Sequence, residues 1–285
     1  MGAIAVIIPP SIAMILYAVV TNASVSALFI AGVMPGLLIG LMVVAYSAWY
    51  AVRTGAARSQ EPWSLRTVWT TTKRAVWTLM APVILFGGIY GGVFTPTEAA
   101  MVMSVYVVLV SMLIHRSLHV RDLWNVLQDT MTLTAKIFVI VAAASVFSLL
   151  LVTEQVPQRL VATLESWNLS LVVILLAINV ILLIAGMFMD PNSAILVFTP
   201  LLWPLADVLG VDVVHFGIII TTNVAIGMFT PPFGLNLFVS TSVFRVPSMT
   251  VIRSVLPFMG IYLIALMLIT YIPTLSLWLP ALLGP

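Results

Sequence analysis

Two Pro-Pro pairs interrupt apolar sequence at matching places, Pro9-Pro10 and Pro231-Pro232. They lie 222 residues apart (231 − 9 = 222), and the residues that follow them are related at the same offset. Identical residues at this offset include Ser26 and Ser248, Val33 and Val255, Pro35 and Pro257, and Ile39 and Ile261. Proline removes a backbone donor and prevents a continuous helix. A helix break repeated in two apolar segments is typical of secondary transporters, which bind substrate and coupling ions there. Two proline kinks with only a packing role are the alternative.

The composition predicts that most of the chain lies in a lipid bilayer. Hydrophobic residues make up 62% of the 285 residues and charged residues 7%, with a mean hydropathy of +1.21. Soluble domains carry roughly 25% charged residues. We therefore expect an all-α, polytopic membrane protein. The net charge of +2 leaves no nucleic-acid-binding footprint, and a chain without cysteine has no disulfide or thiolate metal site.

Apolar stretches separated by polar residues give the expected helices. They cover residues 9–20, 23–52, 79–94, 99–114, 123–152, 169–189, 194–208, 216–229, 235–243 and 256–279. Between residues 94 and 99, Thr95, Pro96 and Glu98 suit the N-cap, first and third positions of a helix with a capping box. This favours a two-pass or re-entrant pair over 79–114, with one long kinked helix as the alternative. The glycines of Gly87–Gly92 indicate either close helix packing or an unwound segment.

The first strongly polar segment covers residues 53–78. Five basic residues between Arg53 and Arg74 stand against Glu61 alone, which predicts a cytoplasmic location. Trp63, Trp69 and Trp77 alternate with these cations, and we expect an interfacial arm helix in the headgroup layer. A loop with tryptophans of the aromatic belt is the alternative.

Three ionisable residues lie in or beside apolar segments, where a charge is costly. Asp190 precedes a proline at the end of a span, so it is either a helix N-cap or a carboxylate near a Na⁺ or substrate pocket. Simple exposure at the membrane surface is a third possibility. Glu98 fits the capping box, and Lys136 is expected to reach the membrane surface from the start of its span.

Oxygen atoms gather around the second Pro-Pro pair. Prolines release upstream carbonyls from helical bonds, and in a membrane these need protein, water or an ion as a partner. We predict a Na⁺ site there, and near the two pairs a substrate site. The predicted Na⁺ ligands are Gly227, Thr230, Asn223, Thr222 and Asp190, and the predicted substrate residues are Ser11, Asn22, Phe233 and Asn236.

No set of residues resembles a catalytic site. The sequence has neither a metalloprotease HExxH motif nor a P-loop, and His115 and His119 lie in a basic loop. We therefore expect that the chain is not an enzyme and needs no organic cofactor.

Four motifs resemble the large membrane subunit of TRAP transporters, the DctM family. They are Ile7–Ile12, Gly87–Ala100, Gly186–Asp190 and Gly227–Asn236. The resemblance covers essentially the whole chain. It implies tripartite, ATP-independent uptake in the bacterial inner membrane by Na⁺ symport of an organic acid anion, such as a dicarboxylate or a sialic acid. A periplasmic binding protein delivers the anion, and a small DctQ-like membrane subunit is the second partner.

The resemblance also implies an elevator-type fold of inverted repeats, in which Pro9-Pro10 and Pro231-Pro232 are the tips of two helical hairpins. Family members have well over a hundred residues before the first tip, and this sequence has eight. We therefore expect an incomplete first repeat. The expected parts are 1–52, a remnant of the first repeat; 53–78, the arm; 79–189, mainly scaffold helices; and 190–285, the second hairpin and closing helix. We also expect residues 1–20 to be poorly ordered or displaced when the chain is alone, and the isolated chain not to transport.

Two other functions fit the sequence. The first is a Na⁺-coupled elevator carrier of another family that works without a binding protein. The second is an inactive fragment or scaffold subunit. Na⁺-dependent uptake that requires a binding protein indicates a TRAP transporter rather than the other carrier. Tight binding to a partner without transport indicates a scaffold subunit.

Overall fold

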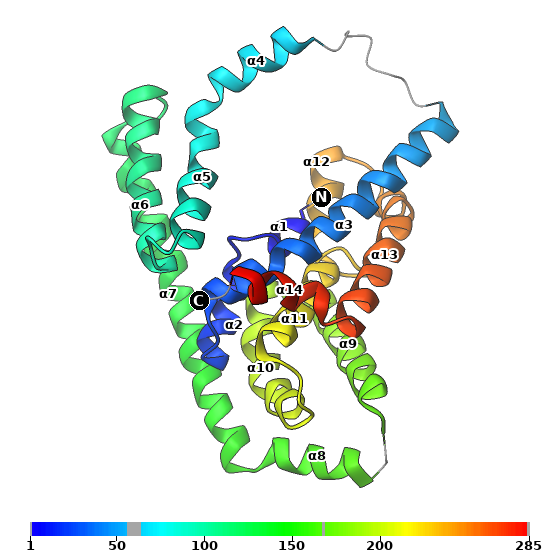
Figure 1. Cartoon of the computed structure of the whole chain (residues 1–285). Helices are drawn as coiled ribbons and strands as arrows, with labels where there is room; N and C mark the ends of the chain where they lie inside the picture. Colours follow the sequence, from blue (N-terminus) through cyan, green and yellow to red (C-terminus); the bar gives the residue numbers. More distant parts are fainter. Residues whose placement is uncertain (1, 56–63, 167–168, 284–285) are drawn as a thin grey trace. The chain divides into compact units, whose positions relative to one another are not determined.

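The computed structural model describes residues 2–55, 64–166 and 169–283, without the side chains of 164–166 (Figure 1). The described residues form helices and connecting turns and contain no strand. Six segments are long and apolar enough to cross a membrane: Ile4–Thr21, Val25–Thr54, Pro96–Ile114, Val120–Thr153, Leu171–Phe188 and Ser248–Tyr271. The expected all-α, polytopic membrane fold is confirmed.

The chain divides into two compact units. One contains Met1–Trp49 and Val139–Pro285, and the other contains Tyr50–Phe138. Helices α3 (Val25–Thr54) and α7 (Val120–Thr153) run from one unit into the other. Both Pro-Pro pairs therefore belong to the first unit, together with α9 (Leu171–Phe188).

The unit of Tyr50–Phe138 is built on an antiparallel helix pair. Helix α5 (Val76–Tyr90) and helix α6 (Pro96–Leu109) are joined by a short turn, and α6 continues as a π-helical segment, η1 (Val110–Ile114). Near the far end of the pair, the Tyr106 hydroxyl donates to the carbonyl oxygen of Trp77 at 2.7 Å. The Glu98 carboxylate accepts from the backbone N–H of Thr95 at 2.8 Å, and the capping box is complete. The capping prediction and the hairpin are confirmed, and a long kinked helix is excluded.

The glycine-rich segment before this turn has a packing role. Helix α5 continues through Gly87 and Gly88 to Tyr90, so those two glycines are not unwound. A Cβ atom on Gly88 would lie 2.4 Å from the Phe94 ring, which folds back onto the helix. Gly92 has a φ of +67°, a left-handed conformation that glycine adopts at no steric cost.

The described part of the arm is shorter than predicted. Helix α4 covers Leu65–Arg74 and none of its residues is buried, as expected for a helix at a membrane surface. Arg53 lies in α3 and Trp77 lies in α5. Arg58, Glu61 and Trp63 lie outside the described residues.

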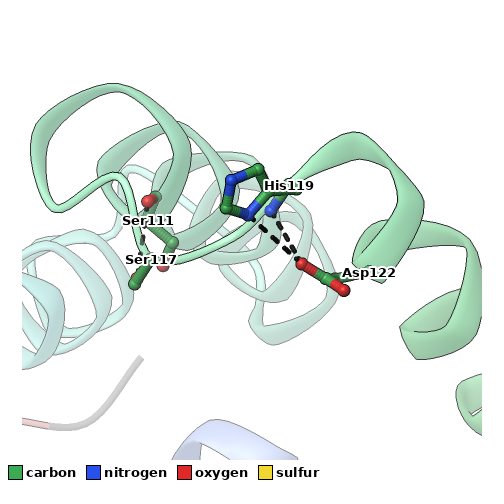
Figure 2. A network of polar contacts seen from close by, with 4 residues as sticks. All are labelled: Ser111, Ser117, His119 and Asp122. Carbon is green, nitrogen blue, oxygen red and sulfur yellow. Dashed lines mark hydrogen bonds and ion pairs between the residues drawn. The ribbon is translucent and has the colours of Figure 1, made fainter.

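A polar turn joins η1 to α7 (Figure 2). The Asp122 carboxylate accepts from the backbone N–H of His119 at 3.0 Å and lies 3.5 Å from the His119 imidazole. Asp122 thus closes the first turn of α7 by reaching back to its N-cap. In the described part of the chain, no cluster of His, Cys, Asp and Glu could hold a metal ion, here or elsewhere.

The other unit contains the predicted repeat. Helix α2 (Ile12–Thr21) and α3 follow the first Pro-Pro pair, and α12 (Leu235–Phe244) and α13 (Ser248–Tyr271) follow the second. Both members of the second pair begin 223 residues after their counterparts (235 − 12 = 223; 248 − 25 = 223). Prolines lie inside α3 and α13 at the matching positions Pro35 and Pro257. The repeat therefore extends from sequence to helix order.

Helix α11 (Val213–Gly227) is the centre of this unit. It is buried continuously from His215 to Gly227. It packs against α9, α2, α13, α14 (Thr274–Leu283), the short α1 (Ile4–Ile7) and α10 (Pro191–Val208). The half-helix that leads to the second Pro-Pro pair is thus enclosed by protein.

The expected displacement of residues 1–20 is wrong for the described residues. Ile7, Met14 and Tyr17 are fully buried, and α2 packs against both α10 and α11. The Ser11 hydroxyl donates to the carbonyl oxygen of Val6 at 2.6 Å, so this carbonyl does not face lipid. Burial of one apolar face holds this segment against α10 and α11, and the bond from Ser11 satisfies one of the carbonyls on which the expectation rested.

Two helix boundaries also differ from the predictions. Helix α13 begins at Ser248 and ends at Tyr271, so the basic connector before residue 256 is largely helical. The polar stretch after α7 contains a separate helix, α8 (Val156–Ser166).

Candidate functional site: a broken helix over a buried polar cluster

The second Pro-Pro pair separates two half-helices, as predicted. Helix α11 ends at Gly227 and α12 begins at Leu235. Phe229 and Thr230, before the prolines, are buried, whereas Phe233 after them is 51% exposed. The predicted break is therefore confirmed. Its predicted burial is confirmed for the residues before the prolines and is wrong for Phe233 after them.

Short backbone bonds within the turn satisfy several of the carbonyls. The Gly227 carbonyl accepts from Thr230 N–H at 3.1 Å, and the Met228 carbonyl accepts from Asn236 N–H at 2.8 Å. The Thr230 hydroxyl donates to the Ile226 carbonyl at 2.8 Å. A carbonyl oxygen has two lone pairs, so the Gly227 and Met228 oxygens can each accept a second partner, whereas the Ile226 oxygen also accepts from Phe229 N–H at 3.1 Å. Fewer carbonyl oxygens are thus left without a partner than the loss of backbone donors at the two prolines predicts.

Two glycines bring the incoming half-helix against α9. A Cβ atom on Gly227 would lie 2.5 Å from the Cα atom of Gly186, and one on Gly186 would lie 3.0 Å from the Cα atom of Gly227. Helices in membranes approach this closely only through small residues. Both glycines are therefore required by the crossing rather than by backbone conformation.

Consecutive polar residues lie inside α11, one turn before its end. Thr221, Thr222 and Asn223 are all fully buried. The Thr221 hydroxyl donates to the carbonyl oxygen of Gly217 at 2.7 Å. The Thr222 hydroxyl oxygen and the Asn223 Oδ1 atom have no hydrogen-bond partner among the described residues. Buried oxygens of this kind cost free energy unless a partner is supplied, so they mark the best candidate site for a cation.

The Asn223 amide nitrogen makes two bonds. It donates to the Asn179 Oδ1 atom in α9 at 2.8 Å and to the Ile219 carbonyl at 2.9 Å. The Asn179 amide in turn donates to the Thr270 hydroxyl in α13 at 3.0 Å. The His215 Nε2 atom lies 3.3 Å from the Thr270 carbonyl oxygen, which returns the chain of contacts to α11. We call these four residues (Asn179, His215, Asn223 and Thr270) the core polar cluster.

Asn179, Thr270 and His215 are not among the site residues predicted from the sequence. One signal was present: Asn179 is a lone amide in the middle of an otherwise apolar span, where polar groups are costly. Nothing in the sequence indicates its partners, because they lie 44 and 91 residues away.

Asp190 is a helix cap. One carboxylate oxygen accepts from the backbone N–H groups of Asn192 and Ser193, both at 3.1 Å, and the other from the Ser193 hydroxyl at 2.6 Å. The side chain is exposed at the start of α10. The capping interpretation is confirmed, and we leave Asp190 out of the candidate cation site.

The predicted substrate residues fall into separate places. Ser11 caps α2 at its start, whereas Asn22 is exposed at its end with a φ of 55°. Asn22 lies eleven positions after Ser11 (22 − 11 = 11), which corresponds to about 16 Å along a helix at about 1.5 Å per residue. Ser11 and Asn22 therefore do not form one site, because α2 stays helical over its whole length.

The side chains of Asn236 and Phe233 also lie in different surroundings. The Phe233 ring packs against Phe188 with 5.1 Å between ring centroids. Asn236 lines a cavity of about 420 Å³ together with Ser240 and Tyr262, whose buried hydroxyl has no partner among the described residues. Asn236 is thus the predicted substrate residue that opens onto a cavity.

The architecture is that of a polytopic membrane protein with two related broken helices, which is typical of secondary transporters. Residues 1–275 match the family model of the tripartite ATP-independent periplasmic transporter, DctM component. The chain belongs to this family, as its motifs predicted, and the family together with the apolar spans makes it a multi-pass protein of the bacterial inner membrane.

Three relatives show the range within the family. The chain is 44% identical over 285 residues to the C4-dicarboxylate TRAP transporter large permease protein DctM of Pseudomonas aeruginosa, with 99% of this chain and 66% of the relative covered. It is 38% identical to the ectoine TRAP transporter large permease protein TeaC of Halomonas elongata, with 97% and 64% covered. It is 36% identical to the sialic acid TRAP transporter large permease protein SiaM of Vibrio cholerae, with 97% and 64% covered.

The chain thus spans about two thirds of the length of these relatives. They are permease subunits of transporters, in agreement with the expectation that the chain is not an enzyme.

Proposed function

We propose that this chain supplies the ion-binding and substrate-binding core of a TRAP transporter that takes up organic acid anions with Na⁺. A periplasmic binding protein delivers the anion, and a small DctQ-like membrane subunit completes the complex. Family membership and the broken-helix repeat support this assignment. The relatives are named for different substrates, a C4-dicarboxylate, ectoine and sialic acid, so the proposal is limited to a class, small carboxylate-bearing solutes.

The observation that carries the proposal is the pair of unpartnered oxygens in α11. Thr222 Oγ1 and Asn223 Oδ1 are fully buried, and both lie one turn before the end of a half-helix. The C-terminal end of a helix carries a partial negative charge, and broken helices of transporters bind Na⁺ with this end and its carbonyls. The carbonyl oxygen of Gly227 and the hydroxyl oxygen of Thr230 would complete the ligand set.

The anion would bind where helices begin after the two breaks. Helix α2 starts two residues after Pro10 and α12 three residues after Pro232, and the positive end of a helix attracts a carboxylate. Asn236, in the first turn of α12, lies beside the cavity and would contact the solute. In an elevator mechanism, the unit that carries both breaks would move as a body across the membrane.

The test uses membrane vesicles that contain the complete transporter with its binding protein. We expect uptake of a labelled C4-dicarboxylate, ectoine or sialic acid to require an inward Na⁺ gradient. Asn223→Ala and Thr222→Val should raise the Na⁺ concentration for half-maximal uptake. Thr199→Val is the matched control, because Thr199 is equally buried, lies in α10 and has no hydrogen-bond partner among the described residues. Uptake that is unchanged when choline replaces Na⁺ would exclude the proposal.

A further inference from the structure

The orientation of the Asn223 amide is fixed by its neighbours. The Ile219 carbonyl can only accept hydrogen bonds, so the NH₂ group of Asn223 must face it, at 2.9 Å. The second N–H of the same group donates to Asn179 Oδ1 at 2.8 Å. Both donors are therefore used, and the Oδ1 atom faces away from both partners, buried and without a partner among the described residues.

Asn179 is held in the same way from its other side. Its Oδ1 atom accepts from Asn223, so its NH₂ group faces Thr270, whose hydroxyl oxygen accepts at 3.0 Å. The Thr270 backbone also accepts from the His215 ring, 3.3 Å away. All members of the core polar cluster are at most 3% exposed, so water does not compete with these bonds.

We propose that Asn179 and Thr270 are positioning residues for the cation site, with no contact to the ion. Thr270 fixes the Asn179 amide, and Asn179 fixes the Asn223 amide with its oxygen turned toward the ion. This inference rests on the proposed function, because it needs a cation at Asn223 Oδ1. Outer partners that orient metal ligands typically change metal affinity by about 10–100-fold when they are removed.

The same geometry links ion binding to helix packing. A cation on Asn223 Oδ1 withdraws electron density from the amide and makes its N–H groups stronger donors. The bond to Asn179 is then stronger in the Na⁺-bound state, and with it the connection of α11 to α9 and α13. Linkage is reciprocal, so loss of this connection weakens Na⁺ binding by the same factor by which Na⁺ strengthens the connection.

The test compares three changes in the complete transporter. Thr270→Val removes the acceptor for Asn179 with almost no change in shape, and Thr270→Ser restores it. Asn179→Leu removes both side-chain bonds at once. Thr199→Val is the control for loss of a buried hydroxyl that has no hydrogen-bond partner among the described residues. Two quantities are measured: the Na⁺ concentration for half-maximal uptake, and the rise of Tm when NaCl replaces choline chloride at constant ionic strength.

We expect Asn179→Leu and Thr270→Val to raise the half-saturating Na⁺ concentration by about tenfold or more. Thr270→Ser and Thr199→Val should stay within about twofold of the unchanged transporter. The Na⁺-induced rise of Tm should shrink in the first two variants only. Thr270→Val changes one hydroxyl, so the comparison with Thr270→Ser stands even when Asn179→Leu does not fold.

Two outcomes would overturn the inference, and they differ in whether the proposed function also fails. Lower Tm in both salts with an unchanged half-saturating Na⁺ concentration, while Asn223→Ala raises it, gives the cluster a structural role and leaves the proposed function standing. No effect of Na⁺ on the unchanged transporter removes the proposed function together with the positioning role.

Discussion

The Tyr17 hydroxyl donates a 2.8 Å hydrogen bond to the carbonyl oxygen of Val213, which lies 196 residues further along the chain. Tyr17 belongs to the helix that follows the first Pro-Pro pair, and Val213 begins the half-helix that leads into the second. The ring of Tyr17 passes over Gly217, where a Cβ atom would lie 2.6 Å from it. This contact connects the two broken helices at the end of α11 opposite the proposed cation site.

Tyr17→Phe should keep the ring in place and remove the bond to Val213. A typical intramolecular hydrogen bond contributes about 1 kcal/mol, so we expect a fall of about that size in the free energy of unfolding. Thermal unfolding of the purified complete transporter in detergent measures it as a lower Tm. Tyr271→Phe is the control: its hydroxyl donates to the Val172 carbonyl at 2.9 Å in an exposed position at the ends of α13 and α9, so its removal should lower the free energy of unfolding less. An equal loss in both variants would contradict a special role for Tyr17.

Gly227→Ala should disrupt the crossing of α9 and α11. The added Cβ atom would lie 2.5 Å from the Gly186 backbone, which cannot move as a flexible side chain would. Overpacking in a core typically costs about 1–3 kcal/mol, so we expect lower Tm and poorer membrane expression.

Gly260→Ala is the matched control for this change. Gly260 also lies in a membrane helix, α13, but a Cβ atom there has no atom within 4 Å. Alanine is a better helix former than glycine by up to about 1 kcal/mol, so Tm should stay the same or rise. If Gly227→Ala behaves like Gly260→Ala, the glycine crossing does not decide the packing.

Asp190→Ala should destabilise the protein without changing its response to Na⁺. Loss of a capping carboxylate typically costs about 1 kcal/mol, and Asp190 uses both oxygens on the first turn of α10. Tm measures the first effect and the half-saturating Na⁺ concentration measures the second. Asp190→Asn keeps a capping side chain and should restore most of the Tm. A large shift of the Na⁺ concentration in both variants would return Asp190 to the cation site.

Local rules account for what the sequence predicted correctly. The break at Pro231-Pro232 follows from lost backbone donors, and the Thr95–Glu98 capping box follows from residues three positions apart. The same rules left three interpretations of Asp190 (helix cap, carboxylate at a binding site, or simple exposure), because capping and ion binding require the same carboxylate. The structure favours the cap, because the Asp190 side chain is exposed and accepts hydrogen bonds from the first turn of its own helix.

Long-range contacts account for what the sequence could not give. Asn223 was predicted as a ligand, but the residue that orients it, Asn179, comes from a helix 44 residues earlier. That pairing depends on how α9 crosses α11, which the Gly186–Gly227 contact sets. Ser11 and Asn22 were grouped because both follow the first Pro-Pro pair, yet an unbroken ten-residue helix separates them.

Ser11 and Asn236 should respond differently to alanine, although both were predicted to bind substrate. The Ser11 hydroxyl donates its one hydrogen to the Val6 carbonyl at 2.6 Å and accepts from Met14 N–H at 3.4 Å, so it has no donor left for a carboxylate. Ser11→Ala should therefore lower Tm by removing a cap and leaving a carbonyl unpaired, with little effect on the substrate concentration for half-maximal uptake.

The Asn236 side chain lines the 420 Å³ cavity, and its amide can donate to a bound carboxylate. Asn236→Ala should raise the half-saturating substrate concentration several-fold, about 1 kcal/mol for one hydrogen bond, and leave Tm nearly unchanged. Uptake kinetics and thermal unfolding of the two variants, measured side by side, check both halves. A reversed pattern, with Ser11→Ala changing uptake and Asn236→Ala changing Tm, would move the anion from the start of α12 to the start of α2.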